Sequence, residues 1–564
     1  MTTVGLLGGS VALDAVRSAL SDTAAGTVTV DPDAVGQVDV ATIAGAVGSA
    51  DFDRATSRAR ETRTPLVSIE LGGVGGEPVA GVEASVSGYA PGTACYRCLN
   101  ERISAAGPET DGGGYETSTA RFAGAVAGRE LAALVSGKES ALLGGVIEVP
   151  HAHRRVLPIP YCECGDPSAS ELRRHEEDRS LEESISMAEV AFDDRLGPIT
   201  SIGEAESFPV PYYLATLAET PFSDGDAPEH AAGVGLDWDP AFMKALGEAM
   251  ERYSAAIYRD AEFGTDPENP IRAERFVRPE WPDADSVSRW HTAEHLETGE
   301  TVQLPGELVV FPPVERTIRP AITTGLGFGN GGADALLSAL YEVIERDAAM
   351  LAWYSTYEPM GLAVDEEGYR TLAARAKSEG LDATALLLTQ DIDVPVVAAC
   401  VHRDGEWPRF AAGSAADLDP AAAARGALEE AIQNWLELRR MGADRAESEG
   451  GAIGTHAAFP EQTREFVSPE TTIPANSVGP AEPPDGGDGL DELTARVRDA
   501  GLDAYAARLT PRDVEFMGFE AVRVVIPSAQ PLFTGEPYFG ERARTVPESL
   551  GFEPRLGRTY HPFP

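Results

Sequence analysis

Three segments of the chain share a helical pattern in which glutamates interrupt an otherwise apolar sequence. The pattern A-L-x-E-x-[MI]-[EQ]-[RN] begins at Ala245, Ala339 and Ala427, so the copies lie 94 and 88 residues apart. At roughly 100° per residue, the charged positions of each copy fall on one side of a helix. Any fold of this chain must therefore accommodate three helix faces that carry carboxylates.

The residues around the charged positions indicate that these faces are turned away from water. In the second copy, Glu342, Glu345 and Arg346 share one arc of the helix. Their neighbours on that arc are small or apolar, namely Ala335, Ser338, Ala349 and Trp353. The first copy places Ala241 and Ala255 around Glu248, Glu251 and Arg252, and the third places Ala423 and Ala427 beside Glu430 and Gln433, although Glu437 extends its polar stripe. In a chain of net charge −46 a solvated face would be charged there, so we expect these carboxylates to face protein or a cleft.

Buried carboxylates need positive charge close by. Arg252 and Arg346 supply part of it, and a divalent cation would supply the remainder. Carboxylate oxygens suit Mg²⁺, which commonly bridges the phosphates of a nucleotide. The pattern predicts a magnesium and nucleotide site shared by three helices; a buried network of salt bridges is the alternative.

A glycine-rich segment, TTGLGFGNGGADALLSAL from Thr323, runs directly into the second of these helices. Its amides could hold a phosphate at the helix N-terminus, with Asn330 and Asp334 beside it. No GxxxxGK[ST] motif occurs, and the HRD at residues 402–404 lacks the asparagine of a kinase catalytic loop. We interpret HRD as part of a hairpin turn at Asp404-Gly405, between DVPVVAACV and PRFAAGSAA.

Four of the five cysteines form two close pairs, Cys95-x2-Cys98 and Cys162-x-Cys164. Two such knuckles from distant loops commonly supply the four thiolates of a tetrahedral zinc site. Four reduced thiols, or two disulfides within the pairs, are the alternatives. His151 and His153 lie near the second pair and could replace one cysteine, whereas Cys400 has apolar neighbours and is expected in the core.

Charge and length limit the class of protein. The 564 residues are too many for one ordinary domain. Only three of the 45 basic residues are lysines, and the acidic residues are spread over the whole chain. This composition favours adaptation to a salty cytoplasm. A basic partner would instead call for acidic residues gathered in one segment. Without a basic stripe or a long apolar run, neither nucleic-acid binding nor a membrane span is expected, and we expect a cytoplasmic protein.

Residues 1–170 are expected to form an α/β domain. It opens with a strand, a glycine turn and a helix in VGLLGGSVALDAVRSAL, and continues with strands in TVTVDPDAV and PLVSIEL. A highly charged stretch, SELRRHEEDRSLEES from Ser170, predicts a linker over residues 171–184. Residues 185–564 mix strands and helices as a large α+β domain, with an exposed loop expected in EPPDGGDGLDE from Glu482.

With these motifs, residues 185–564 resemble the YcaO family of ATP-dependent enzymes that activate peptide backbone amides. The match rests on GEAMERY at residues 247–253, the glycine-rich segment leading to EVIERD at residues 325–347, EAIQ at residues 430–433, and the terminal HPFP. The resemblance implies magnesium ligands at Glu248, Glu251, Glu342, Glu345 and Glu430, nucleotide contacts at Arg252, Asn330, Asp334, Arg346, Gln433 and Lys244, and a catalytic tail of Pro562, Phe563 and Pro564. Two positions depart from the family: GVG at residues 233–235 replaces GKG, and Lys244 stands where a serine is frequent.

Residues 1–170 resemble the ThiF/E1-like domain that accompanies YcaO domains in azoline synthetases. GLLGGS at residues 5–10, VDPDAV from Val30 and PGTACYRCLNER from Pro91 carry this match. No arginine-rich element follows the second strand, so the resemblance implies a degenerate domain that binds structural zinc and helps to present peptide. Because no leader-binding segment precedes Gly5, peptide capture is expected to need a partner protein. We also expect the protein to form a homodimer.

The resemblance implies ATP-dependent phosphorylation of peptide amides, which gives azolines, or thioamides when external sulfide is the nucleophile and a sulfur-delivery protein assists. The first alternative is a non-catalytic accessory protein, such as a factor for ribosomal-protein methylthiolation. The second is an active adenylating enzyme that depends on Asp31.

Overall fold

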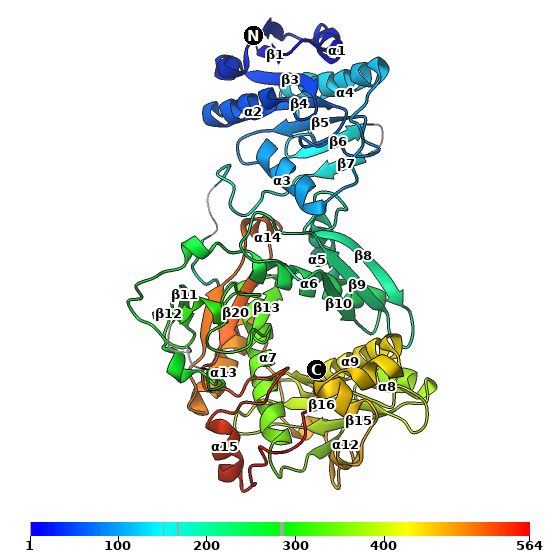
Figure 1. The fold of residues 1–564 in the computed structure, drawn as a ribbon, viewed down its shortest axis with the longest axis vertical. Coiled ribbons are helices and arrows are strands. Elements are labelled where there is room, and N and C mark those ends of the chain that lie inside the picture. The colour runs from blue at the N-terminus through cyan, green and yellow to red at the C-terminus, as the bar shows by residue number, and fades with distance from the viewer. Residues whose placement is uncertain (1, 150–151, 166–168, 282–286, 564) are drawn as a thin grey trace.

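The computed structural model describes residues 2–149, 152–165, 169–281 and 287–563. They form an N-terminal α/β region followed by a larger mixed region, as predicted, and Figure 1 shows the two along the long axis of the molecule. In these ranges no helix is long and apolar enough to cross a membrane.

A seven-stranded sheet forms the centre of the N-terminal region, in the order β2-β1-β3-β4-β5-β6-β7. The strand pairs from β2 to β4 are parallel, and those from β4 to β7 are antiparallel. Helices α1 and α4 are buried against one face, while α2 packs on the other. The elements are β1 (Thr3–Leu7), α1 (Val11–Leu20), β2 (Gly26–Thr29), β3 (Val40–Ala46), α2 (Ala50–Thr62), β4 (Leu66–Leu71), β5 (Ala84–Tyr89), α3 (Tyr96–Ala106), α4 (Thr117–Val135), β6 (Gly145–Val149) and β7 (Ala152–Arg155).

Three further sheets make up the larger region, in the orders β10-β9-β8, β12-β11-β19-β20-β13 and β17-β16-β15-β14-β18. Their strands are β8 (Ile199–Glu206), β9 (Tyr212–Leu217), β10 (His230–Val234), β11 (Trp290–His295), β12 (Thr301–Pro305), β13 (Leu326–Gly329), β14 (Met360–Ala363), β15 (Asp382–Leu387), β16 (Val396–His402), β17 (Phe410–Ala416), β18 (Thr472–Pro474), β19 (Tyr505–Arg508) and β20 (Glu520–Val525). Apart from β14 with β18, the strand pairs in these sheets are antiparallel.

The three carboxylate helices join these sheets. They are α6 (Trp238–Ala256), α7 (Gly332–Trp353) and α9 (Pro420–Met441). Helix α6 contacts β9 and β10 as well as β13 and β20; α7 contacts β13 and β20 as well as β16 and β17; α9 contacts β16 and β17 as well as β10. Each helix therefore bridges two sheets, which brings the three motif copies to the middle of this region (Figure 1).

Shorter helices cover the outside of this arrangement. They are α5 (Leu181–Ala188), α8 (Glu367–Ser378), α10 (Ala443–Ser448), α11 (Gly451–His456), α12 (Glu461–Phe466), α13 (Gly486–Asp499), α14 (Arg512–Phe516) and α15 (Arg542–Leu550). Helices α13 and α15 pack on α7, and α8 packs on α9.

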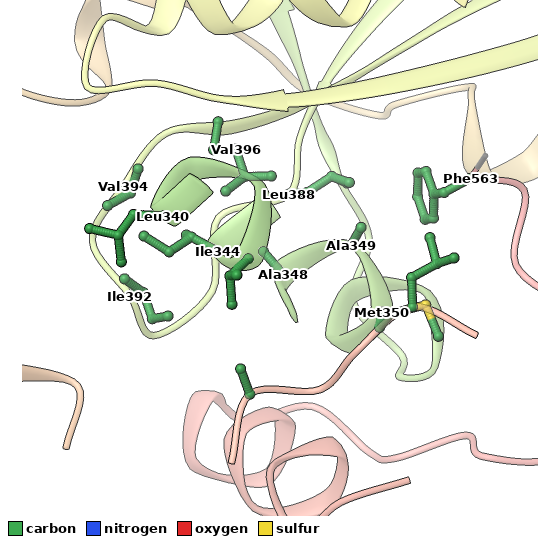
Figure 2. Close-up of a cluster of buried hydrophobic side chains, with 14 of the residues drawn as sticks. Leu340, Ile344, Ala348, Ala349, Met350, Leu388, Ile392, Val394, Val396 and Phe563 are labelled. Carbon is green, nitrogen blue, oxygen red and sulfur yellow. The ribbon is translucent and has the colours of Figure 1, made fainter. Parts of the chain in front are cut away.

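Helix α7 runs through the largest hydrophobic core. Figure 2 shows Leu340, Ile344 and Ala348 of α7 close to Leu388, Ile392, Val394 and Val396, with Phe563 near Ala349 and Met350. Most residues of α7 are buried, so its polar residues must find partners inside the protein.

The charged stretch after Ser170 is bound to the larger region along part of its length. It has no regular structure until α5, which begins with a capping box formed by Ser180 and Glu183. Arg173 forms ion pairs with Glu515 and Glu520. Its carbonyl oxygen lies so close to Gly332 that a Cβ there would be 1.8 Å away. This segment therefore packs against the beginning of α7.

Two local predictions have opposite outcomes. The hairpin at Asp404-Gly405 is confirmed, since β16 and β17 pair in antiparallel register from Val396↔Ala416 to His402↔Phe410. The loop expected in EPPDGGDGLDE is wrong from Gly486 onwards, where α13 begins. Asp485 caps that helix by accepting a hydrogen bond from the Gly486 amide at 2.8 Å.

Candidate functional site

Each carboxylate helix lies directly against a strand at a glycine. A Cβ added to Gly233 of β10 would be 2.1 Å from the backbone nitrogen of Ala245 in α6. At Gly327 of β13 it would be 2.1 Å from the carbonyl oxygen of Ala335 in α7, and at Gly413 of β17 it would be 2.5 Å from that of Ala427 in α9. The three motif copies therefore share one unit, a strand and a helix in backbone contact.

The first glutamate of each copy makes the same contact within its unit. Glu248 accepts a hydrogen bond from the amide of Ala232 at 3.3 Å, Glu342 from that of Gly325 at 3.1 Å, and Glu430 from that of Ser414 at 2.6 Å. These amides are at or just before the strand that packs on the helix. One carboxylate oxygen in each copy is thus anchored on backbone, which fixes the position of the other.

Arg346 connects the second and third copies. Its guanidinium lies 3.3 Å from Glu345, 4.0 Å from Glu342 and 3.6 Å from Glu430. Ser414 of β17 donates a hydrogen bond to Glu345 at 2.6 Å. Ser414 could not be selected from the sequence, because a single hydroxyl in an apolar strand has no pattern and its partner is 69 residues away.

Arg252 has the matching position in the first copy. It forms ion pairs with Glu251 at 2.6 Å and with Glu248 at 3.3 Å. Glu342 is close enough to act electrostatically on both Glu248 and Glu251, so the structure brings all five predicted magnesium ligands and both motif arginines into one constellation.

Burial and mutual repulsion disturb the carboxylates of this constellation. Burial raises the pKa of Glu345 to about 8, although Arg346 opposes the shift, and the charge of Glu430 adds to it. Burial likewise raises the pKa of Glu251 to about 7, against the effect of Arg252. The pKa values of Glu248 and Glu430 are also raised by burial. The two motif arginines thus do not offset the cost of ionising these buried carboxylates, as expected of a site for a cation.

The donor set fits Mg²⁺ better than a cation that needs a closed protein cage. Within the described ranges, the cysteine cluster brings at least three metal-binding side chains to a single point. The glutamates of the helices do not converge in this way. Magnesium usually retains waters and shares its ligands with substrate phosphates. Carboxylates held apart on three helices therefore suit magnesium bound together with a nucleotide.

A cleft of about 490 Å³ lies beside this constellation, a size suited to a small-molecule ligand. It is lined by Lys244, Glu248 and Glu251 of α6, by Asn330 between β13 and α7, and by Ser338 of α7. Lys244 forms an ion pair with Glu429 of α9, so its ammonium group is directed toward that helix. The Asn330 side chain accepts a hydrogen bond from Ser184 at 2.9 Å.

Two other predicted nucleotide contacts are engaged within the protein. Gln433 donates a hydrogen bond to Glu437 at 3.2 Å, one turn further along α9. Asp334, in the first turn of α7, is half-buried, and burial raises its pKa. Neither residue lines the 490 Å³ cleft as the structure presents it.

The C-terminal tail packs on the end of α7. Trp353 donates a hydrogen bond to the carbonyl of Thr559 at 2.8 Å, and Phe563 is 1% exposed. Pro562 and Phe563 line a second cavity, of about 320 Å³, together with Asn434 and Glu437 of α9. The cavity thus reaches the helix that carries Glu430. Pro564 lies outside the described residues.

The four paired cysteines come together as predicted. Their sulfurs lie within 4.8 Å of one another, with 3.4 Å between Cys95 and Cys162 and 3.6 Å between Cys98 and Cys164. Four sulfurs at about 2.3 Å from a zinc ion would be about 3.8 Å apart, so the cluster fits tetrahedral zinc. His153 is exposed on β7 and His151 is outside the described residues, while Cys400 is in the core as predicted.

Comparisons with known proteins agree with this architecture. The heterocyclase in complex with substrate and cofactor superposes with a TM-score of 0.74 at 18% identity, covering 98% of this chain and 83% of the other. The heterocyclase TruD gives a TM-score of 0.64 at 18% identity, with 98% and 82% covered. An uncharacterized protein of Methanothermobacter thermautotrophicus is 28% identical over 381 residues, 63% of this chain and 96% of the relative. The chain therefore has the fold of these heterocyclases.

The family follows from the sequence of the larger region. Residues 232–530, which contain the three carboxylate helices, match the family model described as YcaO cyclodehydratase, ATP and Mg²⁺ binding. The chain belongs to the YcaO family, and the resemblance drawn from its three helix motifs is confirmed.

Proposed function

We propose that this protein activates backbone amides of a peptide by ATP-dependent phosphorylation. The observation that carries the proposal is the threefold unit of strand glycine, backbone-anchored glutamate and helix, which gathers five carboxylates beside a cleft. Membership of a family described as ATP- and Mg²⁺-binding cyclodehydratases supports it.

Each predicted site residue has a place in this proposal. Magnesium would be held by Glu248, Glu251, Glu342, Glu345 and Glu430 and would neutralise phosphate charge during transfer. The nucleotide would be held by Arg252, Asn330, Asp334, Arg346, Gln433 and Lys244. Gln433 must then exchange its hydrogen bond to Glu437 for one to the nucleotide.

The chemistry requires positioning more than a protein nucleophile. A Cys, Ser or Thr side chain of the peptide attacks the preceding carbonyl carbon and loses its proton to a base. The resulting oxyanion takes the γ-phosphoryl group of ATP and releases ADP. Loss of phosphate, together with the amide proton, then leaves an azoline. The arginines and backbone amides of the site would stabilise the charge that develops on the transferred group.

We infer that the tail acts on the peptide. Pro562 and Phe563 line the 320 Å³ cavity, which also touches α9. We assign Pro562, Phe563 and Pro564 to substrate binding and to the base, through a carbonyl or carboxylate of the tail. With external sulfide as nucleophile, the same activation would give a thioamide.

The N-terminal region would support this function without chemistry of its own. We assign residues 1–170 as a degenerate E1-like domain with structural zinc at Cys95, Cys98, Cys162 and Cys164, followed by a linker over residues 171–184 and the YcaO domain over residues 185–564. Partners would be the substrate peptide, a leader-binding or sulfur-delivery protein and a second copy of the chain.

Binding of Mg-ATP tests the site. The purified protein should bind Mg-ATP, and Glu345→Gln should abolish this binding while the zinc content stays unchanged. Glu367→Gln, on the exposed side of α8, removes the same charge and should bind normally. Normal binding by Glu345→Gln would remove the assignment. A protein that binds ATP but never removes water from candidate peptides would instead support the accessory role.

A further inference from the structure

In the part of the chain that the structure describes, two buried arginines near the carboxylate constellation form no ion pair. Arg319, in the segment before β13, is 7% exposed, and Arg523, on β20, is 2% exposed. Arg102 and Arg508 are as deeply buried, but each forms an ion pair, with Asp513 and Glu520 respectively. The unpaired state of Arg319 and Arg523 is therefore not the rule for buried arginines in this protein.

Their hydrogen bonds leave the charge uncompensated. Arg523 donates to the carbonyls of Thr323 and Ile322, both at 2.9 Å, and its buried Nε finds no partner among the described residues. Across the same described ranges, the guanidinium of Arg319 makes no hydrogen bond and no ion pair. Neutral carbonyls satisfy donors but do not balance a charge, and an unbalanced buried charge is costly.

Arg523 lies beside the carboxylate constellation, and Arg319 is close enough to repel it. Arg523 is opposite Leu326 in the β13–β20 ladder, and its Thr323 acceptor is two residues before Gly325, whose amide binds Glu342. Burial lowers the pKa of Arg523 to about 9, with Arg319 adding to the shift and with Glu342 and Glu251 opposing it. Burial also lowers the pKa of Arg319. Arg523 and the two motif glutamates thus act on one another, and Arg319 acts on Arg523.

Such a combination selects a particular anion. A simple carboxylate would be repelled by Glu251 and Glu342, whereas a phosphate group can contact arginines on one side and share a divalent cation with glutamates on the other. Arginine presents a planar fork of donors that matches phosphate oxygens. Neither residue belongs to the three helix motifs, and isolated basic residues give no periodic signal in the sequence.

We propose that Arg319 and Arg523 bind the phosphate that is transferred, first as the γ-phosphoryl group of ATP and then as inorganic phosphate. This inference rests on the proposed function, because it names the group that the same site must hold. The pair would keep the released phosphate next to the glutamates until ADP departs.

The test compares nucleotides that differ by this one group. Calorimetric titration at constant KCl and Mg²⁺ measures the affinity for ATP, the affinity for ADP, and the affinity of the ADP complex for inorganic phosphate. Arg319→Met and Arg523→Met should each lower the affinity for ATP by about tenfold or more, because hydrogen bonds to a charged group are lost. The affinity for ADP should change by less than about twofold. Added phosphate should no longer raise the melting temperature of their ADP complexes. Arg498→Met, 49% exposed on α13, removes the same charge and should change none of these values.

Stability of the ligand-free variants separates binding from a structural role. A buried charge without an acidic partner opposes folding, so Arg319→Met should melt at the same temperature as wild type or above it. A lower melting temperature together with unchanged ATP affinity would overturn the proposal. Equal losses for ATP and ADP would contradict the γ-phosphoryl assignment. If the wild-type protein binds no Mg-ATP, the proposed function fails. The anion site would still be supported if the wild-type protein binds inorganic phosphate and Arg319→Met does not.

Discussion

Arg102 and Asp513 form an ion pair between the two regions of the chain, with side chains that are 1% and 0% exposed. Arg102 is on α3, four residues after Cys98, and Asp513 is on α14. Tyr253 of α6 joins the pair by donating a hydrogen bond to Asp513 at 2.5 Å, and it follows Arg252 of the carboxylate constellation directly. The cysteine cluster is therefore connected to a carboxylate helix through one buried polar network.

Removing one member of this network should weaken the whole molecule. Asp513→Asn leaves the guanidinium of Arg102 buried without a counter-charge, so we expect a loss of about 3–5 kcal/mol of unfolding free energy. Denaturant unfolding followed by tryptophan fluorescence measures it. Asp503→Asn, at a partly exposed pair with Arg275, is the control and should cost about 1 kcal/mol or less. Equal losses of unfolding free energy in the two variants would show that the buried network contributes no more to stability than an exposed ion pair.

Zinc should depend on the four clustered cysteines alone. We expect one zinc ion per chain in wild type and in Cys400→Ala, and its loss in Cys98→Ser, because serine replaces a thiolate ligand by a hydroxyl. Elemental analysis and thiol titration measure this. Arg512 donates to the Cys164 sulfur at 3.3 Å, so loss of zinc should also loosen α14 against the cluster. Cys98→Ser protein with full zinc content would contradict a four-cysteine site.

The carboxylate helices could be predicted because the same spacing occurs three times and the flanking residues are small. The strands that support them could not. GVG at residues 233–235 stands out in the sequence for its missing lysine, yet in the structure Gly233 allows β10 to contact the backbone of α6. That need for a small residue arises from packing between segments, which a single sequence does not display.

Other parts of the site were hidden for a similar reason. Ser414, Arg319 and Arg523 are single polar residues in apolar surroundings, and their importance follows from neighbours far away in the chain. The glycines of α13 favour a loop locally, whereas Leu490, Leu493 and Val497 are buried against the core of α7. Tertiary burial outweighs the weak propensity of glycine for helix.

The tail should affect turnover without affecting Mg-ATP binding. A chain that ends at Tyr560 loses the aromatic ring of Phe563 and part of the wall of the 320 Å³ cavity, but keeps the glutamates and arginines. We expect peptide conversion, followed by loss of water in the mass spectrum, to fall by about 10²-fold or more, as for loss of a positioned catalytic group. Phe563→Leu keeps an apolar anchor and should retain much of the activity. Full activity of the truncated chain would exclude a catalytic tail.

The stability of the ligand-free protein should fall as pH rises through the range in which Glu251 and Glu345 ionise. Their pKa values are raised to about 7 and about 8, well above the value of about 4.3 for an unfolded glutamate. Between those limits the folded state holds more protons than the unfolded state, so its stability decreases with increasing pH. Melting temperatures measured from pH 5 to 9 at constant KCl should therefore decline.

Mg-ATP should reverse this dependence, because magnesium needs ionised carboxylates. We expect its affinity to increase from pH 6 to pH 8.5, and calorimetry in buffers of different ionisation enthalpy should detect about one proton released near pH 7. Glu345→Gln cannot titrate at this position, so its ligand-free melting temperature should depend less on pH than that of wild type. An equal slope in the two proteins would mean that Glu345 is already ionised and balanced by Arg346, and the carboxylates would then be a salt-bridge network rather than a site awaiting a cation.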